Sequence, residues 1–163
     1  MPEWRRKLSN FWVAPFELGG HRWSSVEHYY QASKFKENNP QFYLQFSLDA
    51  NTQGELAKNP VLAQATGGKT GKFKGKVVRE ACIVIDSNFF NGRHKSEMKA
   101  AQLAKFSQNE ELKEMLLATK TAKLQHFVRA KPPIVFIDLM EVRQELGESK
   151  NIPARPLCCI EEE

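Results

Sequence analysis

Residues 21–35, HRWSSVEHYYQASKF, predict the first substantial helix and concentrate aromatic and titratable side chains. The stretch holds one Trp, two Tyr, one Phe, two His, one Glu, one Arg and one Lys. Ser24 followed three residues later by Glu27 has the pattern of a capping box, which predicts a helix from Ser24 to about Lys36. A core helix does not need so many polar groups, so this helix is the first candidate for a functional site.

One face of that helix groups three polar side chains. At 100° per residue, Glu27, Gln31 and Lys34 fall within about 60° of each other, and Tyr30 borders them. A rise of about 1.5 Å per residue separates Glu27 from Lys34 by about 10.5 Å along the axis, a span that a ribose with its base can cover. An alternative stays open, in which Glu27 only caps the helix while Gln31 and Lys34 face water.

The rest of the chain predicts a mainly α, single multihelical domain with a minor β element near the N-terminus. The β element is a hairpin of Trp12–Leu18 and His21–Trp23 around Gly19-Gly20. Further helices are expected at Gln41–Leu48, Gln53–Lys58 and Lys95–Phe106, from Asn109 onward, and at Phe136–Leu146. Two segments are ambiguous: Val61–Ala65 is helix or turn, and Val77–Asp86 is strand or helix. Because Gly147 should end the last helix, we expect a domain over residues 1–147 and a loosely ordered tail over residues 148–163.

Composition is that of a small globular protein. The 163 residues are 41% hydrophobic and 26% charged, which suits a chain with a buried core. No apolar run reaches the roughly 20 residues that a bilayer span needs, and the first residues lack the apolar centre of a signal peptide. Three Cys form no disulfide framework, so we expect a cytoplasmic protein. No His or Cys spacing is typical of metal ligands, so we expect no metal.

Basic residues gather in two places in a chain of net charge +5. Residues 66–76, TGGKTGKFKGK, predict a Gly- and Lys-rich loop, and a shorter basic group, Arg5 to Lys7, stands near the start. The loop is not a Walker A motif, because the required first glycine would fall on Ala63 or Thr66. It can still hold a phosphate through backbone N–H and ammonium groups, or it is a solvated surface loop.

Several short motifs occur in an order that resembles a known family. They are LSNF (8–11), W-x-x-V-E-H-Y-Y-Q-A-x-K-F (23–35), A-x-x-A-K-F (101–106), L-L-A-T with A-K-L (116–124) and L-M-x-V-R (139–143). Over about residues 8–146 the chain resembles the NADAR, or YbiA-like, family. The resemblance implies a mainly α-helical N-glycosidase without a metal or redox cofactor. It implies two substrate classes, phosphorylated ribosylamino-pyrimidines of riboflavin biosynthesis and ADP-ribose attached to guanine, in nucleosides or in DNA.

The resemblance also implies roles for individual residues. Glu27 matches the acid of the E-H-Y block and is expected to stabilise positive charge at the ribose C1 or to activate water. Lys34 matches the lysine of the K-F pair and can instead attack an opened sugar as a Schiff-base nucleophile, if its pKa is lowered. Substrate contacts are expected from Asn10, Phe11, Trp23, His28, Tyr30, Phe35, Gly67, Gly68, Lys69, Lys72, Phe90 and Arg143.

Two departures from the family pattern bear on activity. Phe89 or Phe90 stands where many members carry a Trp, and residues 126–138, HFVRAKPPIVFID, lack a Trp-Gly-Asp-Gly segment. If that Asp has a role, it is lost here or replaced, for example by Asp138 at a different place. Three hypotheses therefore stand: an N-glycosidase, an inactive module that binds ADP-ribose or a nucleotide, and a nucleic-acid-binding domain that uses the basic cluster Lys69–Arg79.

Overall fold

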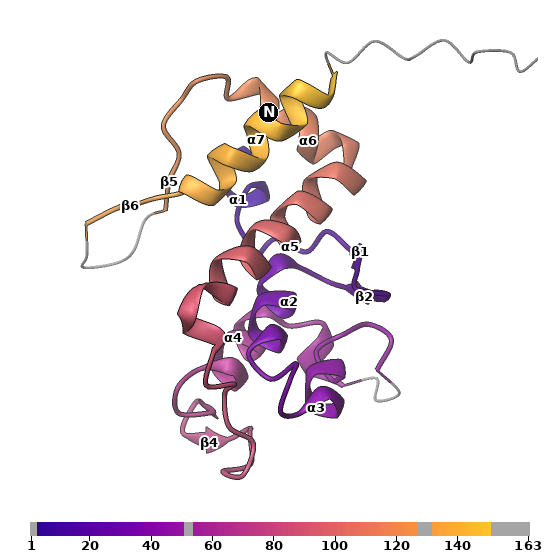
Figure 1. The fold of residues 1–163 in the computed structure, drawn as a ribbon, viewed down its shortest axis with the longest axis vertical. Helices are drawn as coiled ribbons and strands as arrows, with labels where there is room; N and C mark the ends of the chain where they lie inside the picture. Colours follow the sequence, from indigo (N-terminus) through magenta and orange to yellow (C-terminus); the bar gives the residue numbers. More distant parts are fainter. Residues whose placement is uncertain (1–2, 51–53, 127–131, 151–163) are drawn as a thin grey trace, which may run out of the picture.

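The computed structural model describes residues 3–50, 54–126 and 132–150, and its architecture is mainly helical, as predicted (Figure 1). The helices are α1 (Trp4–Lys7), α2 (Val26–Ser33), α3 (Pro40–Leu44), α4 (Pro60–Gly67), α5 (His94–Gln108), α6 (Glu110–Ala118) and α7 (Ile137–Lys150), with a 3₁₀ turn η1 (Glu55–Ala57) and a wide turn η2 (Phe89–Arg93). Three short antiparallel pairs join β1 (Phe16–Leu18) to β2 (His21–Trp23), β3 (Lys72–Phe73) to β4 (Lys76–Val77), and β5 (Gln125–His126) to β6 (Ile134–Val135). None of the helices in these ranges is long and apolar enough to cross a membrane.

The long helix α5 connects the two halves of the core. At one end α2 packs against both α4 and α5, and at the other end α6 and α7 pack against α5 (Figure 1). The first half is rich in aromatic residues and the second in aliphatic residues. Since α5 contributes Ala101 and Ala104 to the first half and Phe106 to the second, the helix holds α2 in a fixed position relative to α7.

The predicted hairpin near the N-terminus is present, although its first strand is shorter than predicted. Gly19 and Gly20 have φ of +63° and +80°, which the two-residue turn requires and glycine adopts without strain. The ladder starts only at Phe16, paired with Trp23, although the N–H of Ala14 before Pro15 still donates to the Ser24 carbonyl at 2.9 Å.

Helix α2 begins one residue later than the capping box predicts. Ser25 is the N-cap, and its Oγ accepts the N–H of His28 at 3.4 Å. Ser24 instead donates its hydroxyl to the carbonyl of Ala57 at 2.5 Å. The capping role predicted for Glu27 is therefore wrong, and its carboxylate accepts a hydrogen bond from Gln31 instead.

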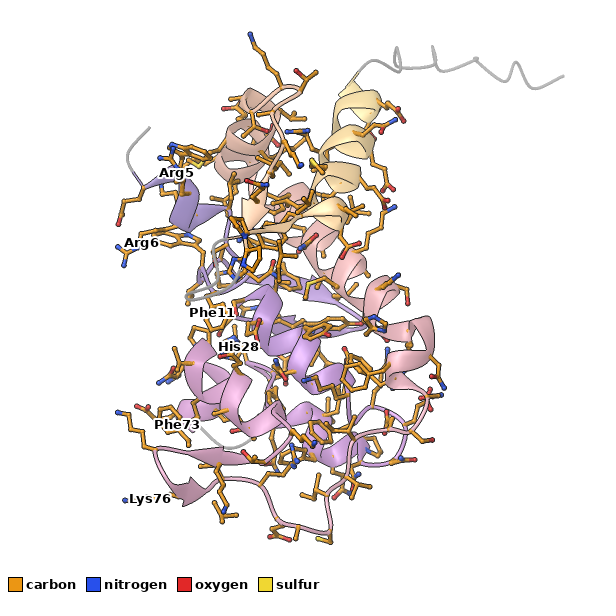
Figure 2. The ribbon with its side chains drawn as sticks, turned by 90° about the vertical axis from the view of Figure 1, so that its left-hand side faces the viewer. Arg5, Arg6, Phe11, His28, Phe73 and Lys76 are labelled. Atoms are coloured by element: carbon orange, nitrogen blue, oxygen red, sulfur yellow. The ribbon has the colours of Figure 1, made fainter. Side chains whose placement is uncertain are left out.

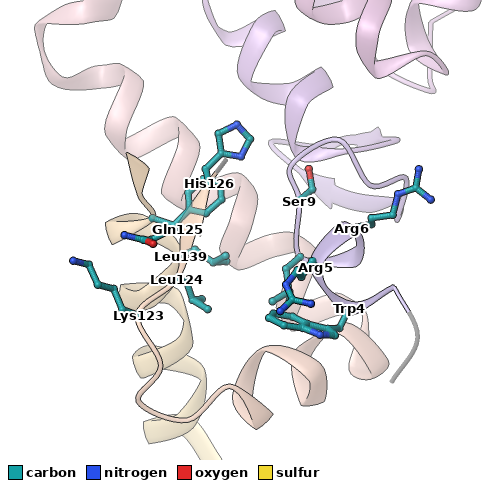
Figure 3. A pocket seen from close by; sticks show the side chains of 11 residues that line it. Trp4, Arg5, Arg6, Ser9, Lys123, Leu124, Gln125, His126 and Leu139 are labelled. Carbon is teal, nitrogen blue, oxygen red and sulfur yellow. The ribbon is translucent and has the colours of Figure 1, made fainter. Parts of the chain in front are cut away.

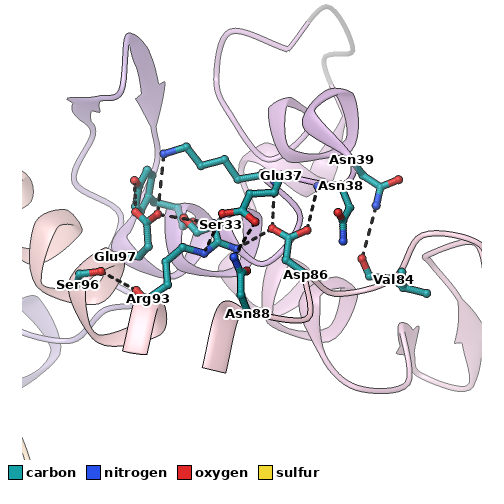
Figure 4. A network of polar contacts seen from close by, with 12 residues as sticks. Ser33, Glu37, Asn38, Asn39, Val84, Asp86, Asn88, Arg93, Ser96 and Glu97 are labelled. Atoms are coloured by element: carbon teal, nitrogen blue, oxygen red, sulfur yellow. Dashed lines mark hydrogen bonds and ion pairs between the residues drawn. The ribbon is translucent and has the colours of Figure 1, made fainter. Parts of the chain in front are cut away.

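The C-terminal end of α2 is set by a residue distant in sequence. The helix ends at Ser33, earlier than predicted, and the buried Asp86 accepts hydrogen bonds from the backbone N–H groups of Glu37 and Asn38, each at 3.0 Å (Figure 4). Arg93 donates to the same carboxylate at 2.6 Å. Asp86 thus turns the chain away from the helix direction.

Other predicted boundaries also differ from the structure. Helix α7 passes through Gly147 to Lys150, so Gly147 is not its stop, and residues 151–163 of the expected tail lie outside the described residues. The predicted loop of residues 66–76 contains the last turn of α4 and the β3–β4 hairpin. Most of Val77–Asp86 is irregular rather than strand or helix.

Candidate active site

A chain of hydrogen bonds joins the three polar side chains of the predicted α2 stripe. Gln31 Nε2 donates to Glu27 Oε1 at 2.7 Å, and Lys34 Nζ donates to Gln31 Oε1 at 2.6 Å. Lys34 Nζ also donates to the carbonyl of Gly67 at 2.9 Å. Glu27, Gln31 and Lys34 are only 5%, 5% and 7% exposed, so the alternative in which this face meets water is wrong.

Helix α4 approaches α2 so closely that its last residue must be glycine. A Cβ built on Gly67 would lie 2.2 Å from Gln31 Oε1 and 2.7 Å from Gln31 Cβ. Both distances are far inside van der Waals contact, and the atoms belong to a buried side chain. The missing side chain at Gly67 is what lets its carbonyl reach Lys34.

We expect Gly67→Ala to destabilise the protein by about 1–3 kcal/mol, the usual cost of overpacking, because the new methyl group displaces Gln31. Gly147→Ala is the matched control, since a Cβ there meets only Leu117 Cδ2 at 3.7 Å inside α7. That change should stabilise by up to about 1 kcal/mol. Urea unfolding of both variants measures the difference, and a similar response at the two glycines would contradict the close contact.

Burial brings the pKa values of the two ionisable groups in this chain, Glu27 and Lys34, closer together. It raises the pKa of Glu27, although the hydrogen bond from Gln31 and the charge of Lys34 act in the opposite direction. Burial also lowers the pKa of Lys34 to about 8, helped by the positive charge of Arg79 and opposed by Glu27. Relative to the ordinary value of 10.5, this raises the fraction of neutral amine at pH 7 about 300-fold.

Two aromatic rings flank the Lys34 ammonium group. Its Nζ lies 5.5 Å from the ring centroid of Tyr30 and 6.0 Å from that of Phe90. Tyr30 is half-buried and packs edge-on against the fully buried Phe89, whereas Phe90 is 58% exposed. Of the two phenylalanines at the position where many family members carry a Trp, Phe90 is the one with an exposed ring near Lys34.

Two further groups near Tyr30 come from distant parts of the chain. The negative charges of Glu27 and Asp138 both raise the pKa of Tyr30, after the larger effect of burial, so Asp138 at the start of α7 faces this region. The ring of His94 lies 5.8 Å from that of Phe90, and its buried Nδ1 has no hydrogen-bond partner among the residues that the structure describes. No local sequence signal places either residue here.

Arg79 organises the loop after α4 instead of joining the surface lysines. Its guanidinium donates to the carbonyls of Thr66 at 2.7 Å, Gly68 at 2.8 Å and Lys69 at 3.3 Å. It also lies 5.2 Å from the ring centroid of Phe35. Arg79 therefore satisfies carbonyl groups at the C-terminal end of α4, and its positive charge lowers the pKa of Lys34.

Three aromatic residues predicted to contact substrate belong to the core instead. Trp23, His28 and Phe35 are fully buried, and so have no surface for a ligand in this conformation. The indole of Trp23 donates to the Leu18 carbonyl at 2.9 Å. His28 Nδ1 pairs with Ser25 Oγ at 2.7 Å, and burial lowers the pKa of its ring to about 4. These residues pack α2 into the core.

Arg143 also lies apart from the predicted phosphate loop. Its guanidinium donates to Thr119 Oγ1 at 2.7 Å and to the carbonyl of Ala122 at 2.9 Å, which ties α7 to the end of α6. In Figure 1, α6 and α7 lie at the top of the molecule and α4 lies in its lower half. Lys69 and Lys72, in contrast, are exposed on the loop that follows α4, with the half-buried Gly68 beside them.

The LSNF segment supports the start of α2. The carbonyl of Asn10 accepts the N–H of Glu27 at 3.1 Å, and Asn10 Oδ1 accepts from Gln102 at 3.1 Å. The fully buried Lys105 of the A-K-F motif donates to the carbonyl of Ser9 at 2.8 Å. Phe11, half-buried, follows on the same segment (Figure 2). The two motifs therefore act together to hold Glu27.

The structure is therefore a multihelical domain that buries a carboxylate and an amine in one hydrogen-bonded chain. Residues 3–130 match the NADAR domain, and the chain belongs to the NADAR family. Within residues 3–50, 54–126 and 132–150, no three His, Cys, Asp or Glu side chains group as metal ligands would.

The sequence is also similar to proteins called N-glycosidase YbiA. Those of Escherichia coli (strain K12) and Shigella flexneri are 30% identical to it over 117 residues, which cover 72% of this chain and 59% of theirs. The chain thus spans about three-fifths of the length of these relatives. The NMR structure of E. coli YbiA matches with a TM-score of 0.65 at 24% identity, over 93% of this chain and 84% of that chain, which confirms the fold.

Proposed function

We propose that the protein is an N-glycosidase that hydrolyses the bond between a ribose C1 and a nitrogen atom. The observation that carries the proposal is the buried chain from Glu27 through Gln31 to Lys34, which ends beside two aromatic rings. A carboxyl group of raised pKa next to an amine of lowered pKa is the arrangement expected of an acid–base pair. Membership of the NADAR family and the similarity to proteins called N-glycosidase support the same reaction.

The two groups suit the cleavage of a ribosyl amine. Glu27 in its acid form can protonate the ring oxygen, so that the furanose opens and C1 becomes an imine of the leaving nitrogen. Neutral Lys34 then adds to C1 and expels that nitrogen as an amine, and water hydrolyses the Lys34 imine to free the sugar. The shorter alternative is direct attack of water on C1, with Glu27 taking the proton from water.

The proposed substrates are ADP-ribosylated guanine, free or in DNA, and phosphorylated ribosylamino-pyrimidines. Both classes carry a ribose linked to nitrogen and at least one phosphate. The exposed Lys69 and Lys72 lie within five residues of Gly67 in the chain, and the Gly67 carbonyl accepts a hydrogen bond from Lys34. We propose that these lysines hold a phosphate of the substrate while Phe90 covers the base.

Mass spectrometry tests the reaction and separates the substrates. The protein is incubated with an oligonucleotide that carries ADP-ribosyl-guanine and, separately, with ribosylamino-pyrimidine phosphates. We expect release of free ADP-ribose or ribose phosphate from one class. Binding of ADP-ribose without cleavage of either class would make the protein an inactive binding module and overturn the proposal.

The proposal predicts a bell-shaped dependence of kcat/KM on pH. The Schiff-base route needs one proton shared between Glu27 and Lys34, so on this route activity falls below the raised pKa of Glu27 and above the pKa of Lys34, about 8. Initial rates at limiting substrate between pH 4 and 10 measure both limbs. Activity that still rises at pH 9 would contradict the role given to the shared proton.

A further inference from the structure

A cavity lies beside α1, and none of the three polar side chains of the buried α2 chain lines it (Figure 3). Its volume is about 580 Å³, within the range of cavities that hold small-molecule ligands. The buried side chains of Leu8, Leu124 and Leu139 form an apolar floor. Its walls come from α1, from residues 123–126 and from the start of α7.

The cavity is positively charged at its rim. Arg5, Arg6 and Lys123 line it together with His126, and no carboxylate is among its lining residues. Arg6 is paired with the exposed Glu3 at 2.9 Å. Across the described ranges, Arg5 and Lys123 form no ion pair with a carboxylate, so these two charges are available to an anion.

Flat aromatic surfaces accompany these charges. The Arg5 guanidinium lies 4.3 Å from the ring centroid of Trp4, and the rings of His126 and Phe136 lie 5.2 Å apart. All four residues line the cavity. Guanidinium groups bind phosphate, and indole and imidazole faces stack on a base, so the cavity combines the two kinds of contact that a nucleotide needs.

We propose that this cavity binds a nucleotide, with its phosphate held by Arg5 and Lys123 and its base stacked on the exposed His126 ring. The nucleotide can be a free nucleoside phosphate or one unit of a nucleic-acid strand. An acidic peptide would satisfy the charges but would leave the rings without a planar partner. The apolar floor and paired rings therefore favour a nucleotide.

The cavity also adjoins the segment that supports the candidate active site. Ser9 lines the cavity, and the neighbouring Asn10 accepts the N–H of Glu27 at 3.1 Å. On the proposed glycosidase function, on which this step rests, the cavity holds a nucleotide of the substrate remote from the bond that is cleaved.

The test measures binding of ADP and of a short single-stranded oligonucleotide by calorimetry. The cavity variant combines Arg5→Ala with Lys123→Ala. The control combines Lys74→Ala with Lys76→Ala, which removes the same charge from exposed residues of the β3–β4 hairpin. Figure 2 shows Arg5 and Lys76 at opposite ends of the molecule.

We expect the cavity variant to bind the ligand at least about tenfold more weakly, because it loses two charge-assisted contacts. With the oligonucleotide, the slope of log affinity against log salt should also fall in magnitude by about 1.4, since each phosphate contact to a single strand contributes about 0.7. The control should keep the wild-type affinity and slope. Weakening for ADP alone assigns a free nucleoside phosphate, and weakening that includes the oligonucleotide assigns a nucleic-acid strand.

Two outcomes would overturn the inference: equal weakening in both variants, or no binding of either ligand by the wild-type protein. If binding depends on Arg5 and Lys123 but no substrate is hydrolysed, the nucleotide-binding inference stands and the proposed glycosidase function is ruled out. If the cavity variant hydrolyses substrate with the wild-type kcat/KM and the wild-type protein binds neither ADP nor the oligonucleotide, the glycosidase proposal stands and the nucleotide cavity is ruled out.

Discussion

Replacing Glu27 by Gln should lower kcat by about 10²- to 10⁴-fold, the contribution typical of a positioned acid–base group. The amide has nearly the same volume and can still accept the hydrogen bond from Gln31. It can neither give up nor take a proton, so chemistry is lost while the fold is kept. Steady-state kinetics and the thermal unfolding midpoint measure the two effects separately.

Glu17→Gln is the matched control for this prediction. Glu17 is exposed on β1, so the same chemical change there should leave kcat and stability at wild-type values. If Glu27→Gln is as active as Glu17→Gln, the Glu27 carboxylate takes no part in the reaction. Its buried position would then be purely structural.

Replacing Lys34 by Met should lower turnover by at least about 10³-fold, because no other amine of the described chain reaches Gln31 and Gly67. Methionine keeps the length of the buried aliphatic chain and removes the nucleophile. Lys58→Met, on an exposed side chain, is the control and should be fully active. Borohydride added during turnover should fix the sugar on Lys34, which peptide mass spectrometry detects. No adduct, with turnover intact, would favour direct attack by water.

The same variant has a predictable effect on stability. The folded-state pKa of Lys34, about 8, lies below the value of 10.5 expected in the unfolded chain. The unfolded chain therefore holds more protons between these values, so wild-type stability rises as the pH rises from about 8 to 10.5. Lys34→Met lacks this contribution, and its free energy of unfolding should gain less over that interval. Parallel stability curves for the two proteins would show that Lys34 is not desolvated by folding.

The sequence predicts the α2 stripe because helical periodicity is a local property. Glu27, Gln31 and Lys34 share a face whatever packs against them, and the structure adds that Gly67 closes that face. The β1–β2 hairpin is predicted for a similar reason, since Gly19-Gly20 supplies the positive φ angles that its turn requires.

Features that depend on contacts between distant residues could not be predicted from local sequence patterns. Ser24 and Ser25 fit a cap equally well, and the Ala57 carbonyl decides between them by binding Ser24. The burial of Trp23 and the position of Asp138 near Tyr30 likewise depend on how segments that are far apart in the chain pack together. An aromatic-rich motif therefore indicates the helix that carries the candidate site but does not show which of its rings are buried.

The central claim is that Glu27 and Lys34 form the catalytic pair of an N-glycosidase. The most direct test is a single-turnover assay of the substrate cleaved by the wild type, with enzyme in excess, on wild type, Glu27→Gln, Lys34→Met and Glu17→Gln. We expect the sugar to be released from its nitrogen by the wild type and by Glu17→Gln, and not on the same time scale by the two site variants. Release at the wild-type rate by both Glu27→Gln and Lys34→Met would contradict the claim.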